Sequence, residues 1–266
     1  MPRDVPDSLA ERITIHHGDC LGVMATLPAE SVDLILTDLP YGMTAAPWDT
    51  PLPLPELWAL WKRLLRPGGA IVLTASQPFT SALVMSNPKW FRCEWIWNKV
   101  NHSNFANANK QPLKIHESVL VFGGGQTTYN PQKTPQKTPQ KTKIIKRNAG
   151  ATNLFMIKRI YCEISALRYP RSIITVSKTS NSHKLHPTEK PVPLFEYLTR
   201  TYSNEGETVL DCCAGSGTTG EAALRAGRLA ILIEKEEKYV QVMRDRFARL
   251  AVTGWQADIF ADGPTP

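Results

Sequence analysis

The stretch ETVLDCCAGSGTTGEAALRAGRLAILIE, residues 207–234, constrains the fold more than any other part of the chain. It has the pattern of a β-strand, a glycine-rich turn, a helix and a second strand that ends in Glu234. Gly215 and Gly217 allow the backbone to pass close to a ligand, and the following helix offers free N–H groups and the positive end of its dipole. Glu234 is placed to accept hydrogen bonds from two ribose hydroxyls. The unit predicts a nucleoside-containing cofactor, and the structural alternative is a tight strand–helix corner with a solvated acid.

The residues after the turn bear on the kind of ligand. Thr218 and Thr219 provide hydroxyls that suit a carboxylate as well as a phosphate. The turn lacks the final Gly-Lys-Ser/Thr of a phosphate-binding P-loop, which argues against an ATPase. The ligand therefore need not be a dinucleotide.

Strand-like runs alternate with helical patterns on both sides of an irregular middle segment. The short runs ITIHH, VDLILT, AIVLTA, CEWIW and SVLVF are rich in β-branched or aromatic residues and are bounded by turn residues. Helices are predicted for ELWALWKRLL, which ends at RPGG, and for PVPLFEYLTRTY and KEEKYVQVMRDRFARLA. This order predicts an α/β fold with a Rossmann-like, doubly wound, mostly parallel sheet. We expect two halves of one domain, residues 12–122 and 183–252, separated by an irregular insert at 123–182.

The insert carries the positive charge of the chain. The net charge is +7 and the sequence pI is about 9.2. From Ser118 to Cys162 there is no Asp or Glu but there are eight basic residues, so the rest of the chain has a net charge of −1. A localised basic surface is an electrostatic footprint of nucleic-acid binding, and the alternative is a solvated lysine-rich loop. The expected nucleic-acid contacts are Lys133, Lys137, Lys141, Lys143, Lys146 and Arg147.

Three copies of the tetrapeptide PQKT occupy residues 131–142 within this insert. A proline at every fourth residue excludes a regular helix and disfavours a central strand. We therefore expect an extended, exposed basic loop there.

Cysteine usage and hydropathy indicate the compartment. The five cysteines are an odd number without metal-ligand spacing, which favours reduced thiols and argues against a zinc site. No apolar run approaches the roughly 20 residues that span a bilayer. The N-terminus also lacks the charged-then-apolar pattern of a signal peptide. We expect a cytoplasmic protein without a membrane segment or a metal.

The segment Asp38-Leu39-Pro40-Tyr41 directly follows the strand-like run VDLILT. Taken in isolation it favours a tight turn, because Asp and Pro are common in turns. The same four residues can also present a carboxylate, a fixed backbone carbonyl and an aromatic face to a bound group. The choice between these interpretations depends on the rest of the chain.

Three motifs together resemble a known family. DLPY, the segment HPTEKP at residues 186–191 and DCCAGSGTT at residues 211–219 resemble the S-adenosylmethionine-dependent amino-methyltransferases of DNA. That family carries a (D/N/S)PP(Y/F/W) catalytic motif and an FxGxG-type cofactor motif. The motif order, with the target-recognition region between the two, resembles the β-class, and the resemblance covers roughly residues 12–250. It implies a class I methyltransferase fold in circularly permuted order, with ITIHHGDC supplying the third strand of the family's sheet.

The resemblance also implies which residues form the site. It places the catalytic motif at Asp38, Leu39, Pro40 and Tyr41, and it makes the six basic residues of the insert DNA contacts. The partner would be double-stranded DNA, with a homodimer and a separate restriction endonuclease as further expectations. S-adenosylmethionine would be held by Asp19, Lys190, Asp211, Gly215, Gly217, Thr218, Thr219 and Glu234. For Asp19, where the family has an acid that binds the adenine amino group of the cofactor, the alternative is a helix-capping role.

This sequence departs from the family pattern at two residues. Leu39 replaces the first proline of the catalytic motif, although Pro40 keeps its fixed φ. Cys213 replaces the aromatic residue of the cofactor motif, which puts the affinity for the cofactor in question.

The chemistry expected at Asp38 follows from the nature of the target. An exocyclic amino group on adenine or cytosine is a poor nucleophile because its lone pair is delocalised into the ring. Two acceptors, the Asp38 carboxylate and a main-chain carbonyl near Leu39 or Pro40, would localise that lone pair and align the transfer. Tyr41 would stack on a base that has been flipped out of the duplex. Aspartate as the first residue of the motif favours N6 of adenine, and the alternatives are N4 of cytosine, an RNA or protein substrate, or a non-catalytic DNA-binding subunit.

Overall fold

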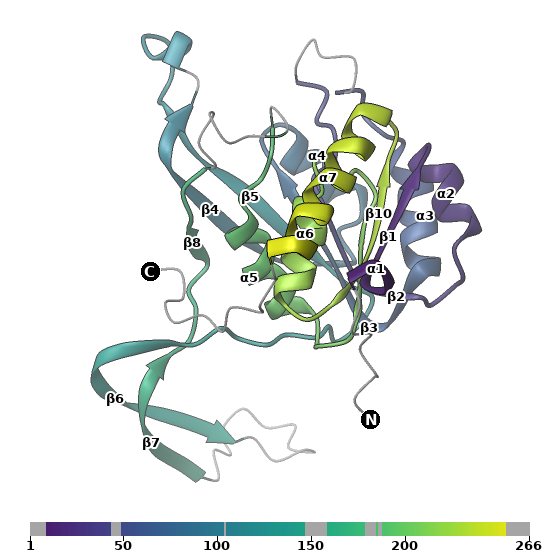
Figure 1. Ribbon diagram of the computed structural model, residues 1–266. Coiled ribbons are helices and arrows are strands. Elements are labelled where there is room, and N and C mark those ends of the chain that lie inside the picture. The colour runs from purple at the N-terminus through teal and green to yellow at the C-terminus, as the bar shows by residue number, and fades with distance from the viewer. Residues whose placement is uncertain are drawn as a thin grey trace. The chain divides into compact units, whose positions relative to one another are not determined.

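The computed structural model shows the alternation of strands and helices that the sequence predicts (Figure 1). It describes residues 9–43, 49–103, 105–146, 159–178, 185 and 188–253. The chain divides into two compact units. The smaller unit is Pro131–Arg171, and the larger one contains Met1–Asn130 together with Ser172–Pro266.

One mostly parallel sheet forms the frame of the larger unit. Its eight strands have the order β1-β10-β9-β2-β3-β5-β4-β8. Neighbours from β1 to β3 are parallel, whereas β5 is antiparallel to both β3 and β4. The strands are β1 (Ile13–His17), β2 (Val32–Thr37), β3 (Leu65–Ala75), β4 (Phe91–Ser103), β5 (Lys114–Phe122), β8 (Ile173–Thr175), β9 (Thr208–Asp211) and β10 (Leu229–Glu234).

The N-terminal strand completes the cofactor half of the sheet. β1 pairs in parallel with β10, so that Ile13 lies opposite Ala230 and His17 lies opposite Glu234. β10 in turn pairs with β9, the strand before the glycine-rich turn. The permuted strand order that the resemblance implied is therefore confirmed.

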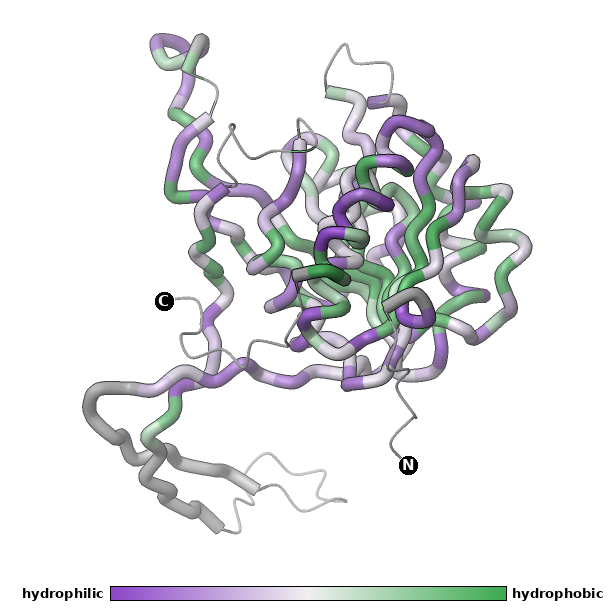
Figure 2. The backbone as a smooth tube through the Cα atoms, in the orientation of Figure 1, coloured by the Kyte–Doolittle hydropathy of each residue, from purple (hydrophilic) through white to green (hydrophobic). Residues whose placement is uncertain are grey.

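Helices cover both faces of this sheet, as the doubly wound prediction requires. Along β2, which is buried throughout, Leu34 and Leu36 belong to one hydrophobic cluster and Ile35 belongs to the other. Such two-sided burial is typical of a central parallel strand. Figure 2 shows hydrophobic residues concentrated in the central strands. The first cluster is covered by α5 (Val192–Tyr202), α6 (Thr218–Arg225) and α7 (Glu237–Thr253), and the second by α2 (Cys20–Thr26), α3 (Leu54–Leu64) and α4 (Phe79–Ser86).

Gly217 is required by the packing of α6 against α7. It precedes α6 in the left-handed conformation, with φ of 82°. A Cβ atom at this residue would lie 2.8 Å from Cγ of Met243 on α7. The glycine therefore serves both the turn and the contact between the two helices.

The smaller unit contains a two-stranded antiparallel ribbon. β6 (Thr134–Lys146) pairs with β7 (Arg159–Arg168), so that Lys146 lies opposite Arg159. The PQKT repeat thus contributes a paired strand where we expected a loop. Each strand of a two-stranded ribbon has a free edge, which tolerates proline. The register also shifts between Pro135 and Gln140, within the repeat.

Two short helices complete the elements of the larger unit. They are α1 (Leu9–Arg12) and the 3-10 helix η1 (Phe105–Asn107). None of the helices in the described ranges is long and apolar enough to cross a bilayer.

Candidate active site at the carboxyl edge of the sheet

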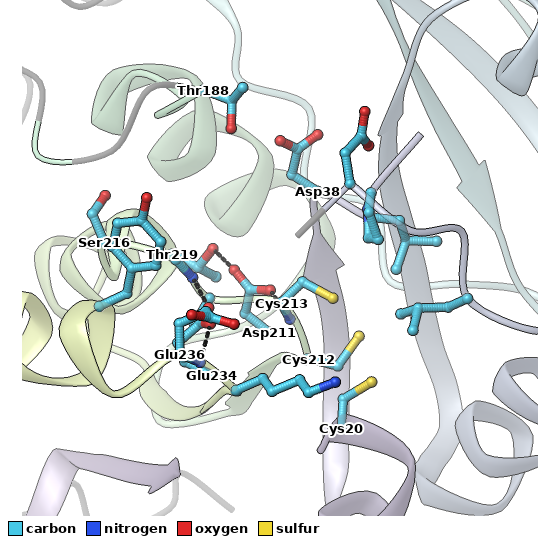
Figure 3. A pocket seen from close by; sticks show the side chains of 18 of the residues that line it. Cys20, Asp38, Thr188, Asp211, Cys212, Cys213, Ser216, Thr219, Glu234 and Glu236 are labelled. Carbon is cyan, nitrogen blue, oxygen red and sulfur yellow. Dashed lines mark hydrogen bonds between the residues drawn. The ribbon is translucent and has the colours of Figure 1, made fainter. Parts of the chain in front are cut away.

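A cavity of about 380 Å³ opens where the parallel strands of the larger unit end. Its lining comes from segments far apart in the sequence: four follow β1, β2, β9 and β10, and a fifth, residues 188–195, contains the start of α5 (Figure 3). The carboxyl ends of parallel strands are the usual ligand-binding edge of an open α/β sheet. The cavity therefore brings the DLPY motif and the glycine-rich turn to one place.

The glycine-rich turn holds Glu234 at the edge of this cavity. The backbone N–H of Gly215 donates to Oε2 of Glu234 at 2.8 Å, and the N–H of Glu236 donates to Oε1 at 2.8 Å. A carboxylate accepts about four hydrogen bonds, so both oxygens keep capacity for a ligand. Gly215 and Glu234 line the cavity, whereas Gly217 is not among its lining residues.

Asp19 combines the two roles between which the sequence left a choice. Its Oδ1 accepts from the backbone N–H of Leu21 at 3.0 Å and of Gly22 at 3.3 Å, which caps helix α2. The residue also lines the cavity. Among the described residues no hydrogen bond reaches its Oδ2, so capping and ligand binding are compatible.

Asp211 is buried below the turn. It accepts hydrogen bonds from the Thr37 hydroxyl at 2.7 Å, from the Cys213 backbone N–H at 3.0 Å and from the Thr219 hydroxyl. Burial raises the pKa of Asp211 to about 6, and the hydrogen bonds from Thr219 and Thr37 oppose that rise. Asp211 thereby ties the end of β2 to the end of β9.

The two threonine hydroxyls after the turn bond to protein carboxylates. Thr219 donates to Asp211, and Thr218 donates to Glu189 at 3.4 Å. Arg246 lies beside this pair and bonds to both Glu189 and Thr218. The structure therefore directs these hydroxyls inward, although both residues still line the cavity.

The Asp38 carboxylate is held by three donors. The Tyr41 hydroxyl donates to Oδ1 at 2.7 Å, and the Thr74 hydroxyl donates to the same atom. The Lys190 ammonium donates to Oδ2 at 2.5 Å. The resemblance assigned Lys190 to the cofactor, and the structure places its Nζ against Asp38, at the wall of the same cavity.

A buried ionic network continues behind Lys190. Its Nζ lies 3.7 Å from Oε2 of Glu117, whose Oε1 accepts from Lys99 at 3.0 Å. Burial alone would lower the pKa of Lys190, but Asp38 and Glu117 outweigh it and the pKa is raised. Burial likewise acts to raise the pKa of Glu117, but Lys190 and Lys99 outweigh it and the pKa is lowered. Both partners are therefore charged at neutral pH.

Sequence reasoning missed Thr74, Lys99 and Glu117. Thr74 lies in the apolar run AIVLTA of β3, and this contrast is a signal that could have identified it, whereas Glu117 stands in the polar first half of β5 and has no such signal. β5 runs antiparallel to β3, with Ser118 opposite Ala75. Its amino-terminal half therefore lies beside the carboxyl end of β3 and delivers Glu117 to the site.

The remaining residues of DLPY all line the cavity, and Leu39 also packs in the core. Leu39 is 3% exposed and packs in the hydrophobic core, so its replacement of a proline keeps an apolar contact. Pro40 and Tyr41 line the cavity. The Tyr41 ring stacks on Phe79 with 5.3 Å between centroids, and the Lys190 ammonium lies 5.6 Å from the Tyr41 centroid.

The basic residues predicted from the insert belong to the smaller unit. Lys133 is exposed, and its ammonium lies 4.4 Å from the centroid of the Tyr169 ring. Lys137, Lys141, Lys143 and Lys146 are on β6, but their side chains lie outside the described residues, as does all of Arg147. Within the described part of the chain no group of His, Cys, Asp and Glu could hold a metal ion.

Comparisons with known proteins agree on one family. A family model described as DNA methylase matches residues 32–245. The DNA adenine methyltransferase YhdJ of Escherichia coli K12 is 28% identical over 250 residues, covering 87% of this chain and 81% of YhdJ. The structure of TTHA0409 from Thermus thermophilus, a putative DNA modification methylase complexed with S-adenosyl-L-methionine, gives a TM-score of 0.55 at 25% identity. That match covers 91% of this chain and 96% of TTHA0409.

A third comparison concerns the fold alone. The PvuII DNA methyltransferase, described as cytosine-N4-specific, gives a TM-score of 0.62 at 17% identity. The match covers 92% of this chain and 94% of the PvuII enzyme chain.

The raised pKa of Asp211 predicts a pH-dependent effect of Asp211→Asn on stability. In the unfolded chain the carboxyl has the ordinary aspartate pKa of about 3.9. The folded protein holds the proton more tightly, so the stability that this residue contributes at low pH is lost as the pH rises toward its folded value of about 6. Relative to Asp211→Asn, the free energy of unfolding of the natural chain should fall by about 1 kcal/mol between about pH 5 and about pH 7.5.

Urea unfolding of both proteins across this pH range measures the difference. Titration of all other groups cancels in the comparison. A difference that does not change with pH would show that Asp211 has an ordinary pKa in the folded state.

Proposed function

Because the chain belongs to the DNA methylase family, we propose that it transfers a methyl group from S-adenosylmethionine to the N6 amino group of adenine in DNA. The observation that carries the proposal is the position of the Asp38 carboxylate, which lines the same cavity as the glycine-rich turn and Glu234. In this interpretation DLPY is a catalytic loop as well as a turn.

The cavity fits the cofactor through its polar groups. Glu234 has acceptor capacity for ribose hydroxyls, and Asp19 has an oxygen available for an amino group. Gly215, with φ of 52°, lets the backbone approach the ligand without a side chain. S-adenosylmethionine supplies a methyl group that is already activated by its positively charged sulfur.

Asp38 would act as an oriented acceptor for the target amino group. Three donors occupy part of its hydrogen-bonding capacity, and about one further acceptor site is left on Oδ2. A main-chain carbonyl at Leu39 or Pro40 would take the second N–H. Together they would localise the nitrogen lone pair and aim it, and the amino group would release its proton after methylation.

Lys190 would act on the reaction by fixing Asp38. Its ammonium bonds to Oδ2, while Thr74 and Tyr41 hold Oδ1, so the carboxylate has little freedom to rotate. Glu117 and Lys99 support Lys190 from behind. The base itself has to leave the helix to reach this acceptor, and the Tyr41 ring, one side of which packs on Phe79, would contact it.

The choice of adenine rests on two supports. The relative YhdJ is named a DNA adenine methyltransferase, and the first residue of the motif here is Asp38. The second candidate is N4 of cytosine, which the similar fold of the PvuII enzyme favours. The same pair of acceptors would serve either amino group.

The basic insert is the proposed DNA contact and target-recognition region. Its lysines follow a ribbon strand at roughly regular intervals, which would present repeated positive charge to phosphates. The homodimer and the separate endonuclease remain predictions from the sequence.

Nucleoside analysis of treated DNA tests the proposed reaction. Duplex DNA incubated with the protein and S-adenosylmethionine should gain N6-methyladenine. Asp38→Ala should lower the rate by about 100-fold or more, because it removes an acceptor aimed at the reacting group. Cofactor affinity and circular dichroism of the variant should be unchanged, and Asp245→Ala on the exposed side of α7 is the control. Formation of N4-methylcytosine alone would overturn the adenine assignment, and loss of folding in Asp38→Ala would favour a structural role.

Substitution of Lys190 tests the positioning of Asp38. Lys190→Met should lower kcat by up to about 100-fold with little change in cofactor affinity, because a misoriented acceptor impairs the transfer. Lys190→Arg keeps the charge and should retain more activity. Lys114→Met is the matched control. Lys114 also interacts electrostatically with Glu117 and Lys99, but its ammonium bonds to Ser76 and not to Asp38. Equal losses at Lys190 and Lys114 would attribute the effect to net charge and contradict the positioning role.

The salt dependence of DNA binding tests the insert. Combined replacement of Lys133, Lys137 and Lys141 by Gln should weaken binding and reduce the slope of log K against log salt by about 2 to 3, because fewer counterions are released. The control replaces three exposed lysines of the larger unit, Lys62, Lys89 and Lys238, by Gln. Fluorescence anisotropy with labelled duplex measures both slopes, and an equal slope in the two variants would exclude the insert as a specific DNA contact.

A further inference from the structure

Three thiols line the cavity and have no part in the proposed transfer. Cys20 begins helix α2 directly after the turn that follows β1, and Cys212 and Cys213 follow β9. Figure 3 shows their sulfur atoms directed toward the same part of the pocket. Cys20 is 7% exposed and Cys213 is half-buried, and because both line the cavity, a reagent would reach them through it.

Cys20 and Cys213 interact through their side chains. The hydrogen bond with Cys213 lowers the pKa of the Cys20 thiol, although burial and the nearby Asp19 act in the opposite direction. The pKa of Cys213 is raised, first by its hydrogen bonds with Cys20 and Cys212 and then by burial. The lowered pKa favours the thiolate at Cys20, and the Cys213 thiol is its hydrogen-bonding neighbour. The thiolate is the nucleophilic form of cysteine.

We propose that Cys20 and Cys213 form a redox-active thiol pair that reacts with small disulfides such as oxidised glutathione, and that oxidation of the pair excludes the cofactor from the cavity. The pair is a modification site within the proposed cofactor cavity, so the exclusion of the cofactor by oxidation rests on the proposed function. The reaction of the thiols themselves does not.

The reaction has two balanced exchange steps. The Cys20 thiolate attacks one sulfur of the small disulfide, forms a mixed disulfide and releases a thiolate that takes up the proton lost by Cys20. Cys213 then attacks Sγ of Cys20 and releases the second small thiol, which takes up the proton of Cys213. Two protein thiols are oxidised to one disulfide, and one small disulfide is reduced to two thiols. A small dithiol such as dithiothreitol reverses both steps.

The oxidised pair would change the parts of the site that hold the cofactor. A disulfide brings the two sulfurs to about 2.05 Å, well inside their non-bonded separation. Cys20 is adjacent to Asp19, and Cys213 is two residues before Gly215. The bond would therefore pull these two ligand-binding segments out of their arrangement in the reduced protein.

The experiment uses the full chain with Cys93→Ser and Cys162→Ser, which leaves the three cavity thiols. Cys93 is exposed and is not among the described residues that line the cavity, and Cys162 belongs to β7 of the smaller unit. Intact mass after treatment with oxidised glutathione should show the loss of two hydrogen atoms, with peptide mapping to a Cys20–Cys213 bond. Calorimetric affinity for S-adenosylmethionine should fall at least tenfold and recover with dithiothreitol. Saturating S-adenosylmethionine added beforehand should slow the oxidation at least tenfold.

Single substitutions in this background separate the roles of the two thiols. Cys213→Ser should stop at the mixed disulfide and keep one glutathionyl group on Cys20. In Cys20→Ser no group should be added in the cavity, and its cofactor affinity should be the same before and after treatment. A bond from Cys20 to Cys212, or no reaction at Cys20, would overturn the assignment of the pair.

The two hypotheses also fail in different ways. An oxidised pair with unchanged cofactor affinity would overturn the exclusion of the cofactor. A reduced protein that does not bind S-adenosylmethionine would refute the proposed function and with it the exclusion of the cofactor, whereas the mass measurement would still decide whether the thiol pair reacts.

Discussion

The hydrogen bond between the Thr37 hydroxyl and the Asp211 carboxylate joins the two halves of the site. Thr37 ends β2 and Asp211 ends β9, and the two strands are paired in parallel through Leu34 with Val209 and Ile35 with Leu210. The DLPY loop begins one residue after Thr37, and the glycine-rich turn begins one residue after Asp211. The position of the DLPY loop relative to the glycine-rich turn therefore depends on this junction. This hydrogen bond depends on the protonation of Asp211, because burial raises the pKa of its carboxyl group to about 6.

A second constraint is the balance of buried charge around Asp38. Lys190 and Lys99 are almost inaccessible, and an unpaired buried ammonium is strongly unfavourable. Each has a carboxylate partner, and Glu117 bridges the two. The network keeps Lys190 charged and so maintains its bond to Asp38. The orientation of the Asp38 carboxylate thus depends on the buried residues Lys190, Glu117 and Lys99 as well as on the DLPY loop.

The order of strands and helices was predictable because each element has a local signature. The runs around β1, β2, β9 and β10 are bounded by turn residues, and α3 and α7 have helical spacing of apolar residues. The ribbon strand β6 was not predictable from its repeat, because proline disfavours a central strand. Only the pairing with β7 shows that β6 has a free edge, where a proline needs no hydrogen-bonding partner. The bond of Lys190 to Asp38 was also not predictable, since the family resemblance assigned Lys190 to the cofactor and Asp38 lies 152 residues away in the sequence.

The sequence by itself determined the chemical groups of the site and the order in which they follow the strands. A carboxylate, a fixed proline, an aromatic ring, a glycine-rich turn and a terminal acid are local features, and their spacing predicts the edge of the sheet on which they meet. Only the tertiary structure decided which donors surround Asp38, that Cys20 and Cys213 line one cavity, and that Leu39 belongs to the core. Those contacts join separate elements, and packing of the whole sheet selects them from many arrangements that the local sequence allows.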